Sequence, residues 1–170
     1  FVLRDDNEST TLGGGIIIDP EAPQWGKSRT HRLKQIDALE MGQPQAVLDR
    51  LLLTDGDIVS MRKCKRTWNL SQQEMDALLG LPPLDAGQLV RISTDKDELL
   101  LSGELWQGYV NCLEQQLAEW HRARPMESGI RPGSLRALVH GRVPERLFKE
   151  VLDDRIRAGQ FVHQDQLIRA

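Results

Sequence analysis

The chain has 170 residues, of which 39% are hydrophobic and 28% charged, so there is enough apolar material for packed cores and general disorder is excluded. Its net charge of -3 argues against a protein whose whole surface binds a polyanion. The sequence has neither an apolar run of about 18 residues nor a basic region followed by an apolar run at its N-terminus. We therefore predict a soluble, cytoplasmic protein without a membrane partner.

Residues 1–28 are predicted to form two strands and a linker. Apolar runs at 1–3 and 16–18 flank a polar, turn-rich stretch and three glycines, a pattern typical of two strands with a connection. A lone hairpin is marginal in water, so we expect these strands to belong to a larger sheet supplied by a longer chain. Prolines at positions 20 and 23 indicate a short linker before the next element.

From Thr30 onward, apolar residues recur with the spacing of a helix. Gly42 interrupts this pattern and Pro44 restarts it at a first-turn position, which predicts two helices or one kinked helix. Asp57 is predicted to cap a third helix. A capping-box sequence that starts at Ser71 predicts a fourth helix, which ends at a glycine and two prolines.

The order of helices and then a hairpin occurs twice. Apolar runs at 89–92 and 99–101 flank a polar turn and predict the first β-hairpin. The second set comprises a long helix over 104–124, helices opened by Pro132 and Pro144, and a hairpin around 163–166. This repeated order predicts tandem winged helices, each a helix-turn-helix variant with a β wing, over 29–101 and 104–170.

Two sets of motifs resemble a known family. Residues 1–5, Phe-Val-Leu-Arg-Asp, followed by Thr-Leu-Gly-Gly-Gly-Ile-Ile at 11–17, are similar to the last strands of the third, β-barrel domain of translational GTPases such as elongation factor Tu. The connection between them is longer here, and the chain continues into a linker, as in the selenocysteine-specific elongation factors, SelB. The second module adds the SelB-like pattern Leu117, Trp120-His121, Pro125, Gly129-Ile130 and Leu135-Arg136.

This resemblance implies an α+β, mostly helical fold. Residues 1–28 would be the end of an elongation-factor-Tu-like barrel with its linker, and two winged-helix modules would follow. The intact protein would deliver selenocysteinyl-tRNA to the ribosome with GTP and magnesium, and would bind an mRNA hairpin, the selenocysteine insertion element, through modules beyond these two. We expect this chain to be a monomeric segment that links the GTP- and tRNA-binding body to the mRNA-binding modules. No phosphate-loop motif is present, so neither cofactor is expected to bind here.

A dense basic cluster is the main candidate for RNA contact. Its residues, with the tryptophan that follows, are Arg62, Lys63, Lys65, Arg66 and Trp68. Several phosphates could be neutralised there, with a solvated helix face as the alternative interpretation. We expect replacement of the four cations to change stability by no more than about 1 kcal/mol. Trp25 and Trp68 are candidates for stacking on bases. A weaker basic set contains Arg29, Arg32 and Lys34.

The helices expected to face a nucleic acid give little support for base recognition. Residues 71–80 contain Glu74 and Asp76 and no basic residue, so this helix should repel phosphates. Residues 144–158 have mixed charge, which is more typical of solvation and pairing within the helix. A protein-interaction pair of winged helices therefore remains an alternative, and a DNA-binding regulator a weaker one.

No catalytic or metal site is predicted. The histidines have no carboxylate or cysteine neighbour that suggests catalysis. Cys64 and Cys112 are far apart and lack the spacing of a zinc site or a disulfide framework, so we expect both to be reduced structural cysteines.

Overall fold

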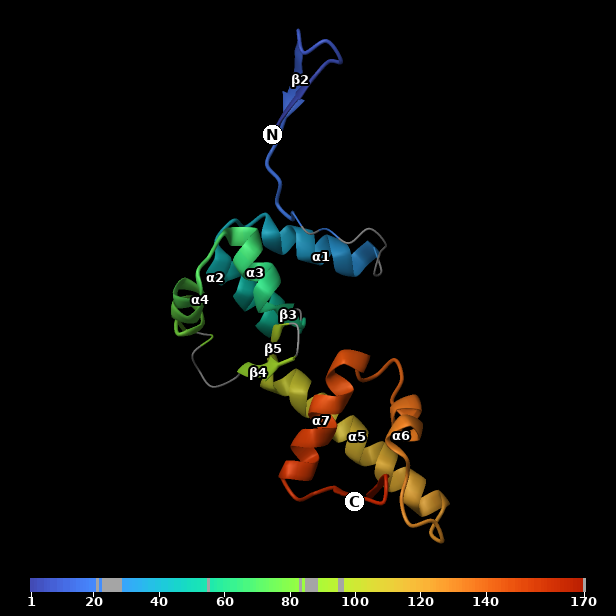
Figure 1. Ribbon diagram of the computed structural model, residues 1–170. Helices are drawn as coiled ribbons and strands as arrows, with labels where there is room; N and C mark the ends of the chain where they lie inside the picture. The colour runs from blue at the N-terminus through green and yellow to red at the C-terminus, as the bar shows by residue number, and fades with distance from the viewer. Residues whose placement is uncertain are drawn as a thin grey trace. The chain divides into compact units, whose positions relative to one another are not determined.

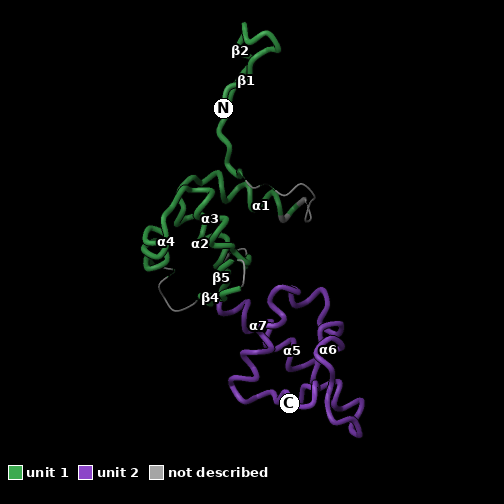
Figure 2. Tube along the Cα trace, viewed as in Figure 1, with its two compact units in different colours: residues 1–102 green, residues 103–170 purple. Residues whose placement is uncertain are grey.

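The computed structural model describes residues 1–20, 22, 29–54, 56–82, 84, 89–94 and 97–169. The chain divides into two compact units, Phe1–Ser102 and Gly103–Ala170 (Figure 2). Helices take up about half of the chain and the sheets are small, so the α+β class is confirmed, with less helix than "mostly helical" implies. In the part of the chain that is described, no helix is long and apolar enough to cross a membrane.

The N-terminal strands form a two-stranded antiparallel hairpin of β1 (Val2–Arg4) and β2 (Thr11–Gly14). The prediction of a second strand at 16–18 is wrong, because the loop closes earlier. The carboxylate of Asp5 accepts hydrogen bonds from the Ser9 hydroxyl at 2.7 Å and the Thr10 N–H at 3.0 Å, which returns the chain at Thr11. Within the described residues, β1 and β2 pair only with each other, and no barrel is formed.

The described residues of unit 1 form four α-helices, which Figure 1 labels, and one π-helical turn. They are α1 (Arg29–Leu39), α2 (Pro44–Asp49), η1 (Arg50–Thr54), α3 (Met61–Trp68) and α4 (Gln72–Leu79). The predicted break between α1 and α2 is confirmed as two separate helices. The capping box of α4 is also confirmed, with the Ser71 hydroxyl accepting from the Glu74 N–H and the Glu74 carboxylate accepting from the Ser71 N–H.

The sheet of unit 1 decides where α3 begins. Strands β3 (Val59–Ser60), β4 (Leu89–Ser93) and β5 (Glu98–Ser102) are antiparallel in the order β3-β5-β4, which confirms the predicted hairpin. The prediction that Asp57 caps α3 is wrong. Residues 59 and 60 pair with β5, so the helix starts only at Met61, and the Ser60 hydroxyl accepts from the Lys63 N–H at 3.0 Å. Asp57 instead accepts a hydrogen bond from Gln35.

Unit 2 contains the predicted three helices and a hairpin. These are α5 (Gly103–Ala123), α6 (Pro132–Leu138), α7 (Glu145–Arg157), β6 (Val162–Gln164) and β7 (Leu167–Arg169). Gly159, at φ +70°, follows the last turn of α7. Asp165 and Gln166 both have positive φ, so the hairpin turns over two residues and is tighter than the expected four-residue loop.

Each unit has its own apolar core. In unit 1, α2, α3, α4 and β5 contribute fully or almost fully buried side chains, among them Leu48, Met61, Met75 and Leu100. In unit 2, the apolar side chains of α5 pack against α6, α7 and β7, with Leu113, Leu117, Leu135, Val151 and Ile168 fully buried. The two cores stabilise two helix-and-sheet units of similar construction.

The two units share one chain topology. In unit 1, β3 is followed by α3, α4 and the β4–β5 hairpin, and β3 pairs with the last strand, β5. In unit 2, Ile130 is followed by α6, α7 and the β6–β7 hairpin, and Ile130 forms an antiparallel bridge to Ile168 in the last strand, β7. Each unit thus contains a strand, two helices and a wing in this order, and the first strand pairs with the last.

Candidate nucleic-acid interface

The basic cluster lies on α3, and the start of that helix determines which side chains face outward. Met61 and Cys64 are buried in the core of unit 1, three residues apart on one helix face. Burial raises the pKa of the Cys64 thiol to about 12, so the thiol stays protonated, in keeping with a structural cysteine. The four cations between and after these two residues are left on the remaining faces of the helix.

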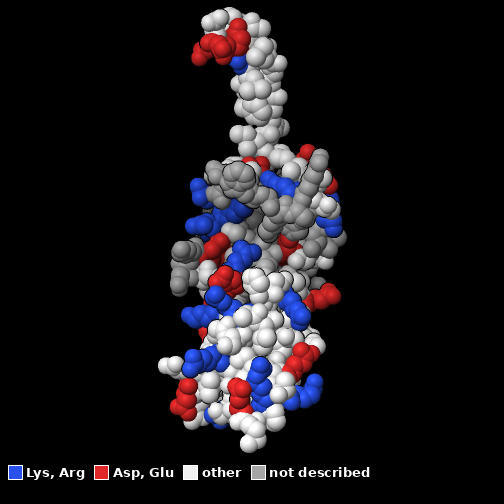
Figure 3. All heavy atoms as spheres, turned by 90° about the vertical axis from the view of Figure 1, so that its right-hand side faces the viewer, with Lys and Arg blue, Asp and Glu red and all other residues white. Residues whose placement is uncertain are grey.

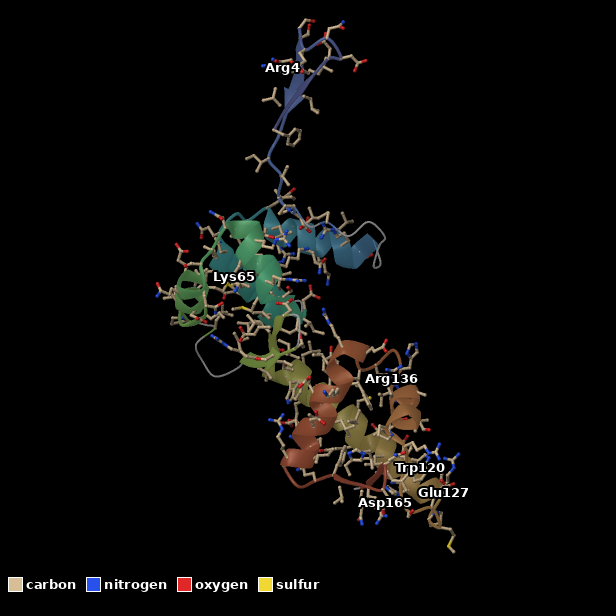
Figure 4. The ribbon with its side chains drawn as sticks, in the orientation of Figure 1. Arg4, Lys65, Trp120, Glu127, Arg136 and Asp165 are labelled. Atoms are coloured by element: carbon tan, nitrogen blue, oxygen red, sulfur yellow. The ribbon has the colours of Figure 1, made fainter. Side chains whose placement is uncertain are left out.

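These four cations are not equivalent. Arg62 is exposed, and within the described residues its side chain has no hydrogen-bond or ion-pair partner. The Lys63 ammonium lies 3.0 Å from an oxygen of Asp19. The ammonium of Lys65, which Figure 4 labels on α3, donates to the amide oxygen of Gln72 at 2.8 Å. Arg66 is exposed and takes part in a further interaction. Arg62 is therefore the cation of this cluster best placed for an outside phosphate.

Trp68 is the last residue of α3 and is half-buried against the core of unit 1. Part of its indole therefore stabilises the unit, and less of the ring is open to a nucleic-acid base than a fully exposed tryptophan would offer. Trp25, the other predicted stacking residue, lies outside the described residues.

The weaker basic set begins α1, and the structure joins it to the cluster on α3. The Arg32 guanidinium lies 2.9 Å from the same Asp19 oxygen that the Lys63 ammonium approaches. Lys34 is exposed, and the side chain of Arg29 lies outside the described part of the structure. Asp19 was missed from the sequence because nothing local distinguishes it from the other acids of the N-terminal segment.

The exposed face of α4 is acidic, as predicted. Hydrogen bonds from the backbone and then the hydroxyl of Ser71 lower the pKa of Glu74. Hydrogen bonds from Gln72 and then Arg91 lower the pKa of Asp76, whose carboxylate lies 3.0 Å from the Arg91 guanidinium. Both carboxylates are ionised at neutral pH, and a phosphate would meet unfavourable charge on this helix.

The corresponding helix of unit 2, α7, arranges its charges differently. Glu145 is paired with Arg136 of α6 at 2.8 Å (Figure 4), and Arg155 with Asp154 at 2.6 Å and Glu114 at 3.5 Å. Pairing within the helix, expected from its mixed sequence, is thus found for the adjacent Asp154 and Arg155. On the face of unit 2 shown in Figure 3, both signs of charge are interspersed.

The aromatic-histidine pair at the end of α5 makes packing contacts within unit 2. The rings of Trp120 and His121 meet edge to face, with centroids 5.2 Å apart, and the Arg124 guanidinium lies 5.6 Å from the centroid of the Trp120 ring. Trp120 belongs to the core of unit 2. In the described residues no group of three or more His, Cys, Asp and Glu side chains could hold a metal ion.

A strand, two helices and a wing, with the first strand paired to the last, define the winged-helix class, and unit 2 has this arrangement around the Ile130–Ile168 bridge. Residues 115–169 match the family model described as elongation factor SelB, winged helix. Unit 2 is therefore a winged-helix domain of the SelB family, and the resemblance predicted from the sequence motifs is confirmed for it. None of the curated proteins matches the chain.

Proposed function

We propose that this chain is a segment of a selenocysteine-specific elongation factor, in which its two units connect the GTP- and tRNA-binding body to the modules that bind the mRNA hairpin. The observation that supports this most is the match of residues 115–169 to the SelB winged helix. The same strand-helix-helix-wing order in unit 1 fits an array of such modules.

The N-terminal hairpin supports the same proposal. Phe1, Leu12 and Ile16 are 60%, 68% and 87% exposed. A two-stranded ribbon with so much apolar surface in water is marginally stable, and a neighbouring sheet would cover it. A barrel like that of elongation factor Tu would provide such a sheet immediately before the two units.

In this proposal the described residues have no catalytic role. GTP, magnesium and hydrolysis belong to the body of the factor, and the mRNA hairpin is bound by further modules. The whole protein would have selenocysteinyl-tRNA and the ribosome as partners. It would work in the cytoplasm. The coding sequence upstream of Phe1 tests this directly, because it should encode a GTPase with a phosphate loop. An unrelated upstream sequence would contradict the proposal.

We further propose that α3 contacts RNA phosphates without reading their sequence. Arg62 is exposed and without a side-chain partner in the described part of the chain, while Lys65 and Arg66 lie on the same short helix. Three cations at a surface attract a polyanion mainly by releasing counterions, which gives weak binding with a strong salt dependence. The ribosome and the mRNA both offer such a backbone.

Fluorescence anisotropy with a labelled RNA hairpin, measured over a range of salt concentrations, tests this contact. Arg62→Gln should weaken binding and reduce the salt slope by about 1, for any hairpin sequence. Arg4→Gln is the matched control, because Arg4 is an exposed arginine of the hairpin and the charge change is the same (Figure 4). Equal effects of the two changes, or no RNA binding at all, would favour a pair of winged helices that contacts only protein.

A further inference from the structure

Two cations from distant parts of unit 1 meet at one carboxylate oxygen, that of Asp19. The Oδ2 atom of Asp19 accepts from Nη2 of Arg32 at 2.9 Å and from Nζ of Lys63 at 3.0 Å. Arg32 belongs to α1 and Lys63 to α3, whereas Asp19 lies between the N-terminal hairpin and α1 in the sequence. The fold therefore brings two cations together that are 31 positions apart in the sequence.

The three side chains differ in their exposure to water. The side chain of Asp19 is only 3% exposed, whereas those of Arg32 and Lys63 are 21% and 37% exposed. The cations thus enclose the carboxylate and still reach the surface themselves. Arg62, exposed and next to Lys63 in the chain, extends the same positive surface.

A guanidinium and an ammonium that converge on one oxygen at about 3 Å form a binding site for oxyanions in general. Arginine favours planar carboxylate and phosphate groups, and lysine adds a compact positive charge beside it. A phosphate diester of RNA presents the same kind of charged oxygen as the Asp19 carboxylate. Either anion can satisfy the two cations, but both cannot occupy the same position.

Building on the RNA contact proposed for α3, we propose that Arg32 and Lys63 are a binding site for an RNA backbone phosphate, and that Asp19 occupies this site in the free protein. RNA and Asp19 then compete. RNA binding then releases Asp19 from its contacts with α1 and α3. A partner that binds Asp19 only when it is released would therefore strengthen RNA binding. By thermodynamic linkage, RNA would strengthen the binding of that partner by the same factor.

The test compares four forms of the full 170-residue chain by anisotropy with a fluorescein-labelled oligouridylate at low salt. Asp19→Asn, which removes the competing anion, should tighten binding about fivefold or more. Lys63→Gln in the Asp19→Asn background should abolish this gain. Asp37→Asn is the matched control, because Asp37 is an exposed acid of α1 and its replacement changes the net charge equally. We expect it to change affinity by less than about twofold.

Each outcome decides the question. A gain for Asp19→Asn that Lys63→Gln removes supports the site, whereas equal effects of Asp19→Asn and Asp37→Asn overturn it. If no form binds RNA, the RNA contact at α3 fails as well. Should Asp19→Asn not fold, as judged by circular dichroism, the carbon-13 shift of the Asp19 carboxyl group in the wild-type protein replaces it. A change on addition of oligouridylate supports displacement, and an unchanged shift overturns it.

Discussion

Units 1 and 2 have the same order of strand, two helices and wing, yet they distribute charge differently over the two helices. In unit 1 the basic residues lie on the first of these helices, α3, and the second, α4, is acidic. In unit 2 the corresponding second helix, α7, has exposed Arg146 and Lys149 together with acids. A shared topology therefore does not imply a shared binding surface, because the surface depends on side chains that the core does not constrain.

The corresponding helices also begin differently. The capping box at Ser71 satisfies backbone donors at the start of α4, whereas Pro144 precedes α7 and offers no side-chain cap. The stability of α4 thus depends on a local polar arrangement, and that of α7 more on its buried residues. The four predictions below test these differences, in order of decreasing effect.

The largest effect should come from the two separate cores. Leu117→Ala in α5 should cost about 3 to 4 kcal/mol, because Leu117 is fully buried and its removal leaves a cavity. Leu48→Ala is the equivalent change in unit 1. Native-state hydrogen exchange should show loss of protection in the mutated unit only. Loss in both units from either change would mean that they unfold as one cooperative body.

The bridge between Ile130 and Ile168 completes the topology of unit 2, and Gly129 lies beside it. A Cβ atom on Gly129 would lie 2.9 Å from the carbonyl oxygen of Ile168, so Gly129→Ala should cost about 1 to 3 kcal/mol. At Gly108, in the interior of α5, a Cβ meets nothing within 4 Å. Gly108→Ala should therefore stabilise by about 0.5 to 1 kcal/mol. Urea unfolding measures both, and destabilisation by both changes would contradict this account.

Adjacent cations on α3 should have unequal effects on stability. Lys63→Gln should cost about 1 to 2 kcal/mol, because it removes a cation that lies 3.0 Å from the buried Asp19 carboxylate. Arg62→Gln should stay within about 0.5 kcal/mol. For Lys63 this prediction differs from the expectation, drawn from the sequence alone, that all four cations can be replaced at little cost. Thermal unfolding of the two single variants compares them, and equal stabilities would show that the Asp19 contact contributes nothing.

The smallest effect concerns the start of α4. Ser71→Ala should cost about 1 kcal/mol, because it removes the hydroxyl of the capping box. Since the folded-state pKa of Glu74 is lowered, its contribution is fully present above the ordinary carboxyl pKa of about 4.3 and is lost as the pH falls through the lower folded-state value. Hydrogen exchange followed against pH should show α4 losing protection in acid before α7. Glu74→Gln should weaken this dependence and leave the part that comes from Asp76, whose pKa is also lowered. An unchanged acid response in that variant would exclude Glu74 as a cause.

Features that depend on neighbouring residues were determined by the sequence alone. The capping box at Ser71, the break before Pro44, the ends of α5 and the wings of both units were all predicted correctly, because their signals lie within a few residues of each other. The resemblance of the second module to SelB also came from local motifs, and the family match supports it. Such signals are sufficient for the order of the elements.

Only the tertiary structure decided how distant residues combine. The pairing of β3 with β5 moved the start of α3 from Asp57 to Met61, since strand residues cannot at the same time be helical. Packing against the core half-buried Trp68, which the sequence alone left as a stacking candidate. The contact of Asp19 with Arg32 and Lys63 joins three segments whose separation in the chain hides their proximity. Burial and charge pairing depend on distances in space, and the sequence specifies those only through the completed fold.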